Sequence, residues 1–172
     1  MADGELVWLA EQASAAPVII EVGCWKGRAT LALADATPGR VFAVDHWRGS
    51  DPEHLAEIAA AGPDSVYHAF LAAMGPRIQA GTVIPLRMAA VDAVRLFTHG
   101  SVDFVFIDAS HAYADVQQDI AGYRALVRPG GILAGHDYAI RQLPGVQQAV
   151  DEAFPAIERV MSIWWVRLGE AT

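Results

Sequence analysis

The 172-residue sequence contains a single cysteine, Cys24, and a single lysine, Lys26. One cysteine cannot form an intrachain disulfide, and it cannot build a cysteine-rich zinc site by itself. The arginines are scattered and no polybasic run occurs, which argues against nucleic acid and anionic membranes as partners. No apolar run approaches the ~20 residues that a transmembrane helix needs. The acidic segment Met1–Glu5 lacks the positive charge of a signal peptide, so we expect a cytoplasmic protein.

What the sequence does contain is a large apolar fraction. Hydrophobic residues make up 53% and charged residues 19%, a composition that excludes a disordered chain. The length predicts one domain over residues 1–172, with an N-terminal helix in residues 1–16 and a core in residues 17–168. The formal net charge of −8 favours a small or cationic ligand over an anionic polymer.

Short apolar segments alternate with alanine-rich segments of helical periodicity. Central segments such as Phe104–Ile107 are continuously apolar, which is typical of parallel strands covered on both faces. Val116, Ile120 and Tyr123 recur at helical spacing, and Leu126–Gly131 is expected to end that helix. The pattern predicts an α/β fold with one doubly wound, mostly parallel sheet. The expected strands are Val18–Val22, Val41–Asp45, Val83–Leu86, Val102–Asp108, Gly131–Gly135, Ile157–Met161 and Ile163–Leu168.

A glycine-bearing turn follows the first expected strand. Gly23 and Gly27 lie between this strand and the next helix, where backbone N–H groups can face a ligand. The spacing matches neither the dinucleotide fingerprint nor the phosphate-binding P-loop, so alone it also fits a plain strand-to-helix turn. Asp45 strengthens the ligand interpretation, because an acidic residue about 20 residues farther on can accept hydrogen bonds from ribose hydroxyls. The alternative is that Asp45 caps the following helix.

Histidines and aspartates gather just after the later strands. Asp108 and His111 follow the fourth expected strand, and His136 and Asp137 follow the fifth. Because the carboxyl ends of parallel strands share one edge of a sheet, Asp108, His136 and Asp137 could meet there and hold a metal. Carboxylates suit Mg²⁺, Ca²⁺ or Mn²⁺, whereas an added imidazole favours a transition metal. The alternative is a set of buried polar groups that hydrogen-bond to one another.

Several segments together resemble a known family. Residues Glu21–Gly27 are similar to motif I of class I S-adenosylmethionine-dependent methyltransferases. Further segments resemble the small bacterial methyltransferases of family 24, which are related to macrocin-type O-methyltransferases and cephalosporin hydroxylase-like proteins. The resemblance covers the range Pro17–Leu168, and the segments that carry it are Val44–Gly49, Phe106–Tyr113 with Asp119, Pro129–Tyr138 and Leu143–Phe154.

The resemblance implies a seven-stranded, Rossmann-like sheet that ends in an antiparallel hairpin, with S-adenosylmethionine as the cofactor. It implies that the glycine turn surrounds the methionine part of the cofactor and that Asp45 binds the ribose. Trp47 and the turn Met88–Ala90 would flank the adenine, although the two alanines of this turn offer only backbone and apolar contact. The residues expected to bind the cofactor are Glu21, Gly23, Trp25, Gly27, Asp45, His46, Trp47, Ala89 and Asp108.

The metal-dependent catechol-type O-methyltransferases share the last two sites of this pattern. By that resemblance, Asp108, His136 and Asp137 bind a divalent metal, either Mg²⁺ or another ion, with His136 in place of a hard oxygen ligand. His111 stands where that group has its catalytic lysine, and a histidine can act as a general base near neutral pH. The expected catalytic residues are therefore His111, Asp108 and His136.

These observations predict methyl transfer from S-adenosylmethionine to a hydroxyl group of a small molecule or a sugar-containing natural product, with assistance from a metal. Two alternatives remain open. One is a hydroxylase-like enzyme with non-haem iron, held by His111, His136 and a carboxylate. The other is a non-catalytic module that binds the cofactor. The expected partner is a small-molecule acceptor, not nucleic acid or a membrane, and Trp164 or Trp165 favours a homodimer.

Overall fold

Seven strands form one sheet in the computed structural model, which describes residues 1–169. The strand order is β3-β2-β1-β4-β5-β7-β6. Strands β1 to β5 run parallel, whereas β7 pairs antiparallel with both β5 and β6. The predicted α/β sheet with a C-terminal antiparallel hairpin is therefore confirmed. The strands are β1 (Val18–Val22), β2 (Arg40–Asp45), β3 (Val83–Arg87), β4 (Val102–Ile107), β5 (Val127–Gly135), β6 (Glu158–Val160) and β7 (Ile163–Arg167).

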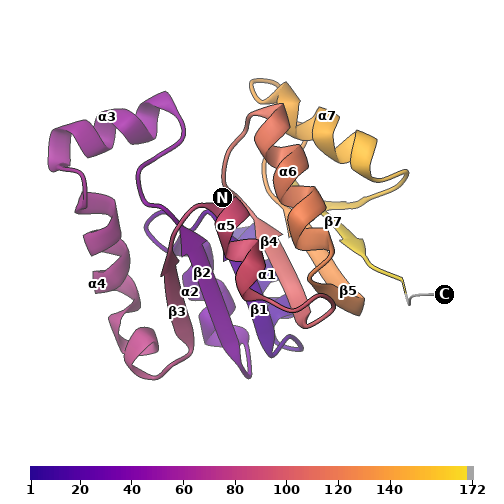
Figure 1. Cartoon of the computed structure of the whole chain (residues 1–172), viewed down its shortest axis with the longest axis horizontal. Coiled ribbons are helices and arrows are strands. Elements are labelled where there is room, and N and C mark those ends of the chain that lie inside the picture. Colours follow the sequence, from indigo (N-terminus) through magenta and orange to yellow (C-terminus); the bar gives the residue numbers. More distant parts are fainter. Residues whose placement is uncertain (170–172) are drawn as a thin grey trace.

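Helices cover both faces of the sheet (Figure 1). On one face Phe104 and Phe106 of β4 pack with α1, α2 and α4, and on the other Val105 and Ile107 pack with α5, α6 and α7. The alternation along β4 thus separates two apolar cores, as expected for a strand covered on both sides. The helices are α1 (Asp3–Ala13), α2 (Arg28–Ala36), α3 (Pro52–Ala61), α4 (Ser65–Gln79), α5 (Ala90–Ala93), α6 (Tyr113–Arg124) and α7 (Pro144–Ala153), with a 3₁₀ turn η1 at Val94–Leu96.

Helix α3 differs from the longer helices because none of its residues is buried. Its first turn is fixed by Asp51, whose side chain accepts a hydrogen bond from the backbone N–H of His54 at 2.9 Å. The helix stands apart from the sheet, above α4 in the view of Figure 1. Within residues 1–169, no helix combines the length and the apolar character needed to cross a membrane.

The fifth strand begins earlier than we predicted. The sequence pattern placed the end of a helix and a turn in Leu126–Gly131, with the strand starting at Gly131. Instead, α6 ends at Arg124, and Val127 already pairs with Val102 of β4 before the register shifts. Gly130 adopts a φ of +77°, a conformation that glycine accepts without strain. The proline and the glycines therefore form an irregularity within the strand rather than a connection before it.

The two tryptophans of β7 have different environments. Trp164 is only 1% exposed, and its ring lies 2.7 Å from the position that a Cβ on Gly135 would occupy. Trp165 is half-buried, and its ring centroid lies 5.8 Å from that of Trp8 in α1. Both rings thus pack within their own chain, and the expected homodimer stays a prediction.

Candidate functional site

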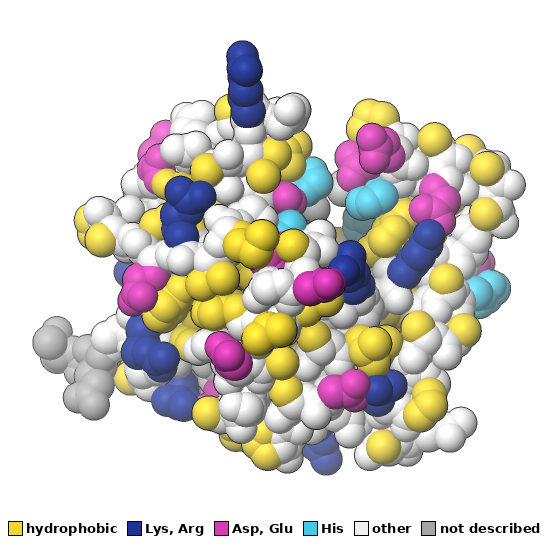
Figure 2. All heavy atoms as spheres, turned by 180° about the vertical axis from the view of Figure 1, so that it is seen from behind, with side chains coloured by type: hydrophobic (Ala, Val, Ile, Leu, Met, Phe, Trp, Pro, Cys, Tyr) yellow, Lys and Arg dark blue, Asp and Glu magenta, His cyan; other side chains and the backbone are white. Residues whose placement is uncertain are grey.

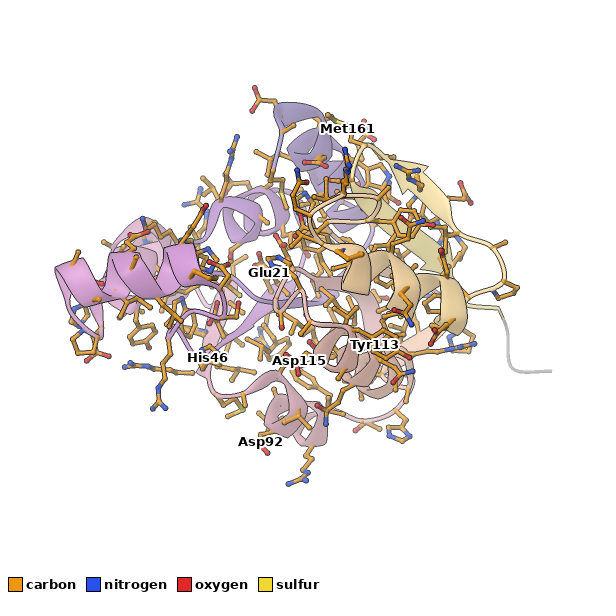
Figure 3. The ribbon with its side chains drawn as sticks, turned by 90° about the horizontal axis from the view of Figure 1, so that it is seen from above. Glu21, His46, Asp92, Tyr113, Asp115 and Met161 are labelled. Atoms are coloured by element: carbon orange, nitrogen blue, oxygen red, sulfur yellow. The ribbon has the colours of Figure 1, made fainter. Side chains whose placement is uncertain are left out.

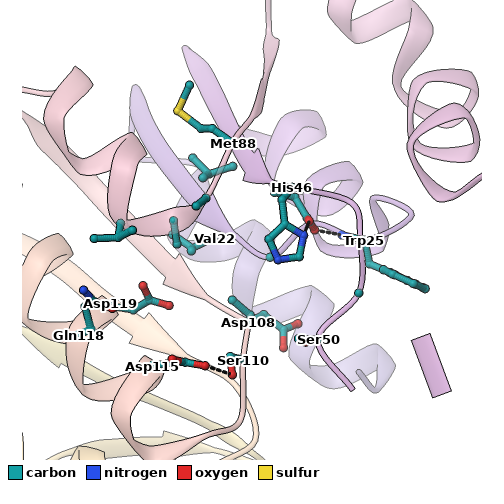
Figure 4. Close-up of a pocket in the computed structure, with 18 of the residues that line it drawn as sticks. Val22, Trp25, His46, Ser50, Met88, Asp108, Ser110, Asp115, Gln118 and Asp119 are labelled. Carbon is teal, nitrogen blue, oxygen red and sulfur yellow. Dashed lines mark hydrogen bonds and ion pairs between the residues drawn. The ribbon is translucent and has the colours of Figure 1, made fainter. Parts of the chain in front are cut away.

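A pocket of about 280 Å³ lies at the carboxyl ends of β1 to β4 (Figure 4). The turn after β1 contributes Gly23 and Trp25 to its wall, the turn after β3 contributes Met88–Val91, and the end of β4 contributes Asp108–Ser110. Seen from behind, the surface is hollowed between its two halves, and histidine and carboxylate side chains gather at this hollow (Figure 2). Parallel α/β sheets bind their ligands at this edge.

The glycines of the first turn are required by packing. Gly23 has a φ of +87°, and a Cβ at this position would lie 2.1 Å from the carbonyl oxygen of Asp108. Gly27 has a φ of +89° and precedes α2, and its missing Cβ faces Phe70 and Met74 in the core. Gly23 therefore lets β1 and β4 approach each other beside the pocket, whereas Gly27 is needed on the core side of the turn.

Asp45 fastens this turn to the end of β2. Its Oδ2 accepts hydrogen bonds from the backbone N–H groups of Cys24 and Trp25, both at 2.9 Å. Its Oδ1 accepts one from the N–H of Trp47 at 2.6 Å. A carboxylate has about four acceptor positions, so these three bonds leave capacity for a ligand hydroxyl. The sequence suggested that Asp45 faces a ligand, but its role in holding the turn was not predicted.

The two tryptophans near Asp45 point in different directions. Trp25 lines the pocket and stacks on His54 of α3, with ring centroids 3.8 Å apart. Trp47, expected beside an adenine, is fully buried against Tyr67 and Phe70 of α4 instead. Its indole N–H donates to the carbonyl oxygen of Trp25 at 2.7 Å. Trp47 thus supports the turn from the core, while Trp25 connects the pocket to α3.

Glu21 lies beneath the same turn. It is 1% exposed, and its Oε2 has no hydrogen-bond partner among residues 1–169. Burial, together with the nearby carboxylates of Asp108 and Asp45, raises the pKa of Glu21 to about 8. In the view from above, Glu21 lies near the centre of the molecule, and His46 and Asp115 lie on different sides of it (Figure 3).

A second cluster of polar side chains joins the ends of β4 and β5. Asp108, His136 and Asp137 each offer one potential ligand atom, and these three atoms lie within 4.8 Å of one another. His136 Nδ1 is 3.1 Å from Asp137 Oδ1 and 3.5 Å from Asp108 Oδ1. Asp137 has a φ of +62°, a strained conformation that often marks functional positions. The structure therefore brings together the three residues that the sequence proposed as metal ligands.

Glu5 of α1 completes this cluster, and the sequence analysis missed it. The residue is 2% exposed, and its Oε2 lies 3.2 Å from His136 Nε2. The hydroxyl of Ser162 donates to Glu5 Oε1 and also lies 3.0 Å from His136 Nε2. Burial opposes ionisation of Glu5, but hydrogen bonds from Ser162, Ala2 and His136 outweigh it and lower its pKa to about 2. The sequence alone does not indicate that an acidic residue in the N-terminal helix contacts a residue 131 positions away.

Two further histidines lie beside the clusters. His111 Nε2 is 2.9 Å from Asp137 Oδ2, and this hydrogen bond raises the pKa of His111 even though burial opposes the charged form. His46 lines the pocket but is partly exposed, and its Nδ1 accepts a hydrogen bond from the N–H of Arg48 at 3.0 Å. His111 thus belongs to the Asp108–His136–Asp137 cluster, whereas His46 lies at the pocket rim.

The charged side chains that line the pocket are acidic. Carboxylates line the pocket at Asp45, Asp108, Asp115 and Asp119, and in the described part of the chain no lysine or arginine side chain lines it. The remaining walls are largely apolar, including Val22, Met88 and the two alanines that follow Met88. Such a pocket suits a ligand that combines positive charge, hydroxyl groups and a flat apolar part.

Comparisons with known protein families and sequences give a family match. The model of a methyltransferase domain family, Methyltransf_24, matches residues 20–138. A comparison with curated protein sequences finds no significant match.

Solved structures of methyltransferases share the fold. The O-methyltransferase NovP superposes with a TM-score of 0.73 at 14% identity, over 97% of this chain and 80% of that one. The O-methyltransferase TomG from Streptomyces achromogenes, involved in tomaymycin synthesis and solved with S-adenosylmethionine, gives 0.71 at 14% identity, over 98% and 82%. An O-methyltransferase from Bacillus cereus, solved with S-adenosylhomocysteine, gives 0.68 at 18% identity, over 97% and 82%.

Proposed function

The chain belongs to the methyltransferase domain family, and from that premise we propose that it transfers a methyl group from S-adenosylmethionine to a hydroxyl group of a small molecule. The observation that carries this proposal is the turn after β1, which Asp45 fastens at the edge of an acidic pocket. A sulfonium ion is cationic, and a carboxylate-lined pocket favours it. A small hydroxylated acceptor, such as a sugar-containing natural product, is the substrate class that we propose.

The residues present fit S-adenosylmethionine. Asp45 has acceptor capacity left for ribose hydroxyls, and the apolar Met88–Ala90 wall suits a flat base. Gly23, Trp25, His46 and Asp108 line the rest of the pocket. Three further residues of the expected set face the buried side of the turn. They are Glu21 and Trp47, whose side chains are buried, and Gly27, where a Cβ would face the core. We propose that these three hold the shape of the turn and that the pocket-lining residues contact the cofactor.

The second cluster fits a divalent metal. Asp108, His136 and Asp137 would hold the ion, which would lower the pKa of a hydroxyl group bound to it. Glu5 faces His136 Nε2 and favours a proton there, which leaves the lone pair of Nδ1 toward the two aspartates. A carboxylate behind a ligating histidine is a common arrangement at metal sites. The mixed ligand set suits Mg²⁺ less well than a transition ion such as Mn²⁺.

His111 is the general base in this proposal. Its Nε2 lies against Asp137, so a proton on Nε2 leaves Nδ1 free to accept the hydroxyl proton of the acceptor. S-adenosylmethionine supplies a methyl group on a positively charged sulfur. Attack by the acceptor oxygen on this methyl carbon would break the carbon–sulfur bond, and the electron pair of that bond would stay on sulfur. The residues of the chain hold the acceptor in line and remove its proton.

The two alternatives are not favoured. A hydroxylase that used iron at His111, His136 and a carboxylate would not need the turn after β1, which Asp45 holds by hydrogen bonds. A non-catalytic module would not need His111 and the three potential ligand atoms beside the pocket. The expected homodimer and cytoplasmic location stay predictions.

Cofactor binding is the first test. We expect the wild-type protein to bind S-adenosylhomocysteine in isothermal titration calorimetry, and Asp45→Asn to weaken binding at least about tenfold. The reason is that an amide accepts hydrogen bonds from ribose less strongly than a carboxylate. Asp92→Asn, on the exposed surface of α5, is the control and should bind like the wild type. Failure of the wild type to bind at millimolar ligand would exclude the proposed function.

Metal binding is tested separately with Mn²⁺. We expect the signal of free Mn²⁺ in electron paramagnetic resonance to fall as the ion binds to wild-type protein. Asp108→Ala should weaken this binding at least about tenfold because it removes one of three ligands. The control is again Asp92→Asn. Equal Mn²⁺ affinity in Asp108→Ala and the wild type would contradict the assignment of these ligands, but not the cofactor site.

A further inference from the structure

Asp119 of α6 is a buried acid that has no hydrogen-bond partner among residues 1–169. It is 7% exposed, and it lines the pocket between α6 and the strand ends. Burial, with a smaller contribution from the nearby carboxylate of Asp115, raises the pKa of Asp119 to about 7, and neither a hydrogen bond nor a basic side chain within residues 1–169 offsets this. Leaving a buried carboxyl unpaired is costly, so a donor from a ligand is the natural complement.

The neighbouring carboxylate behaves differently. Asp115 lies one turn earlier on α6 and lines the same pocket, but its Oδ2 accepts a hydrogen bond from the hydroxyl of Ser110 at 2.7 Å. Asp119 has no such neighbour, and its carboxyl points into the pocket (Figure 4). Among residues 1–169, the lack of a hydrogen-bond partner therefore distinguishes Asp119 from Asp115.

The pocket that Asp119 lines also has an apolar wall. Met88, Ala89 and Ala90 form an apolar wall that offers no polar side chain. The hydroxyl of Tyr123, one turn after Asp119 on α6, donates to the carbonyl oxygen of Ala90 at 2.8 Å. This bond fixes α6 against the alanine turn, so Asp119 keeps a defined position relative to the apolar wall.

We propose that Asp119 recognises the adenine of the cofactor by accepting a hydrogen bond from its exocyclic amino group. The proposal rests on the proposed function. By the proposed function Asp45 would hold the ribose, and Trp25 lies on the other side of the pocket from Asp119 in Figure 4. The base must then extend toward Met88, Ala90 and Asp119. Asp119 supplies the polar contact that the alanines after β3 cannot.

The test compares S-adenosylhomocysteine with its 6-deamino analogue, in which the base is purine, by calorimetric titration. We expect the wild type to bind the analogue at least about tenfold more weakly, because one hydrogen bond to an acidic group is lost. In Asp119→Ala the two ligands should bind within about twofold of each other. Asp119→Asn should restore the preference, since its amide oxygen still accepts from the amino group. Asp92→Asn, whose carboxylate is exposed on α5 and does not line the pocket, is the control and should keep the wild-type ratio.

The outcomes separate this proposal from the proposed function. If the wild type binds both ligands equally, or if Asp119→Ala keeps the wild-type ratio, the role of Asp119 is overturned while cofactor binding stands. If the wild type binds neither ligand, the proposed function fails as well. The comparison of two ligands on the wild type does not depend on whether any variant folds.

Discussion

Gly23→Ala is expected to destabilise the protein by about 3 kcal/mol or more and to abolish binding of S-adenosylhomocysteine. The new methyl group would lie 2.1 Å from the carbonyl oxygen of Asp108 and 2.5 Å from its carbonyl carbon. Both are backbone atoms of the loop after a central strand, so no side-chain rotation relieves the collision. The φ of +87° at Gly23 adds strain that alanine does not tolerate well.

This collision cannot be relieved without moving a strand. Val22 pairs with Ile107, and the N–H of Asp108 donates to the carbonyl oxygen of Val22 at 2.7 Å. Any shift that makes room at Gly23 therefore weakens the β1–β4 pairing, and it also moves the pocket wall at Asp108. Stability and ligand binding should be lost together.

Urea unfolding and calorimetric titration check this prediction. Gly169→Ala is the control, because Gly169 is exposed after β7, its φ is not in the left-handed region, and a Cβ there would meet no atom within 4 Å. We expect this control to change the free energy of unfolding by no more than about 0.5 kcal/mol, as is usual for surface substitutions. An unchanged urea midpoint in Gly23→Ala would show that the turn is not packed as described.

The predictable part of the fold was the part that depends on local pattern. Continuous apolar segments such as Phe104–Ile107 mark strands covered on both faces, and the sheet confirms them. The start of β5 was not predictable, because proline and glycine commonly end an element. Here Val127 pairs with Val102 before the irregularity at Gly130. That pairing depends on a strand 25 residues away in the sequence, which a local pattern does not record.

In the site, too, the features set by local pattern were predictable and those set by distant contacts were not. Spacing after the strands indicated that Asp108, His136 and Asp137 could meet, since parallel strands end at one edge. Spacing could not tell which way a side chain points after a strand. Trp47 has a φ of +53° and turns into the core rather than the pocket. Glu5 was missed because its contact with His136 joins the first helix to the fifth strand.

His111→Ala is expected to lower kcat about 100-fold or more, with little change in the affinity for S-adenosylhomocysteine. The imidazole is the proposed acceptor of the hydroxyl proton, and it does not line the pocket that we assign to the cofactor. Its other ring nitrogen is held by Asp137 at 2.9 Å, which fixes the orientation of the ring. Turnover is measured as release of S-adenosylhomocysteine from S-adenosylmethionine, with catechol and vicinal diols as test acceptors and Mn²⁺ present.

His111→Gln separates proton transfer from support of Asp137. Glutamine can still donate a hydrogen bond to the Asp137 carboxylate, but it cannot accept a proton near neutral pH. If His111 is the base, the glutamine variant should lose as much activity as the alanine variant. If it instead retains activity while alanine does not, His111 positions Asp137 and the base lies elsewhere. His99→Ala is the control, because His99 is exposed in the loop before β4 and lines neither the pocket nor the metal cluster, so its kcat should equal that of the wild type.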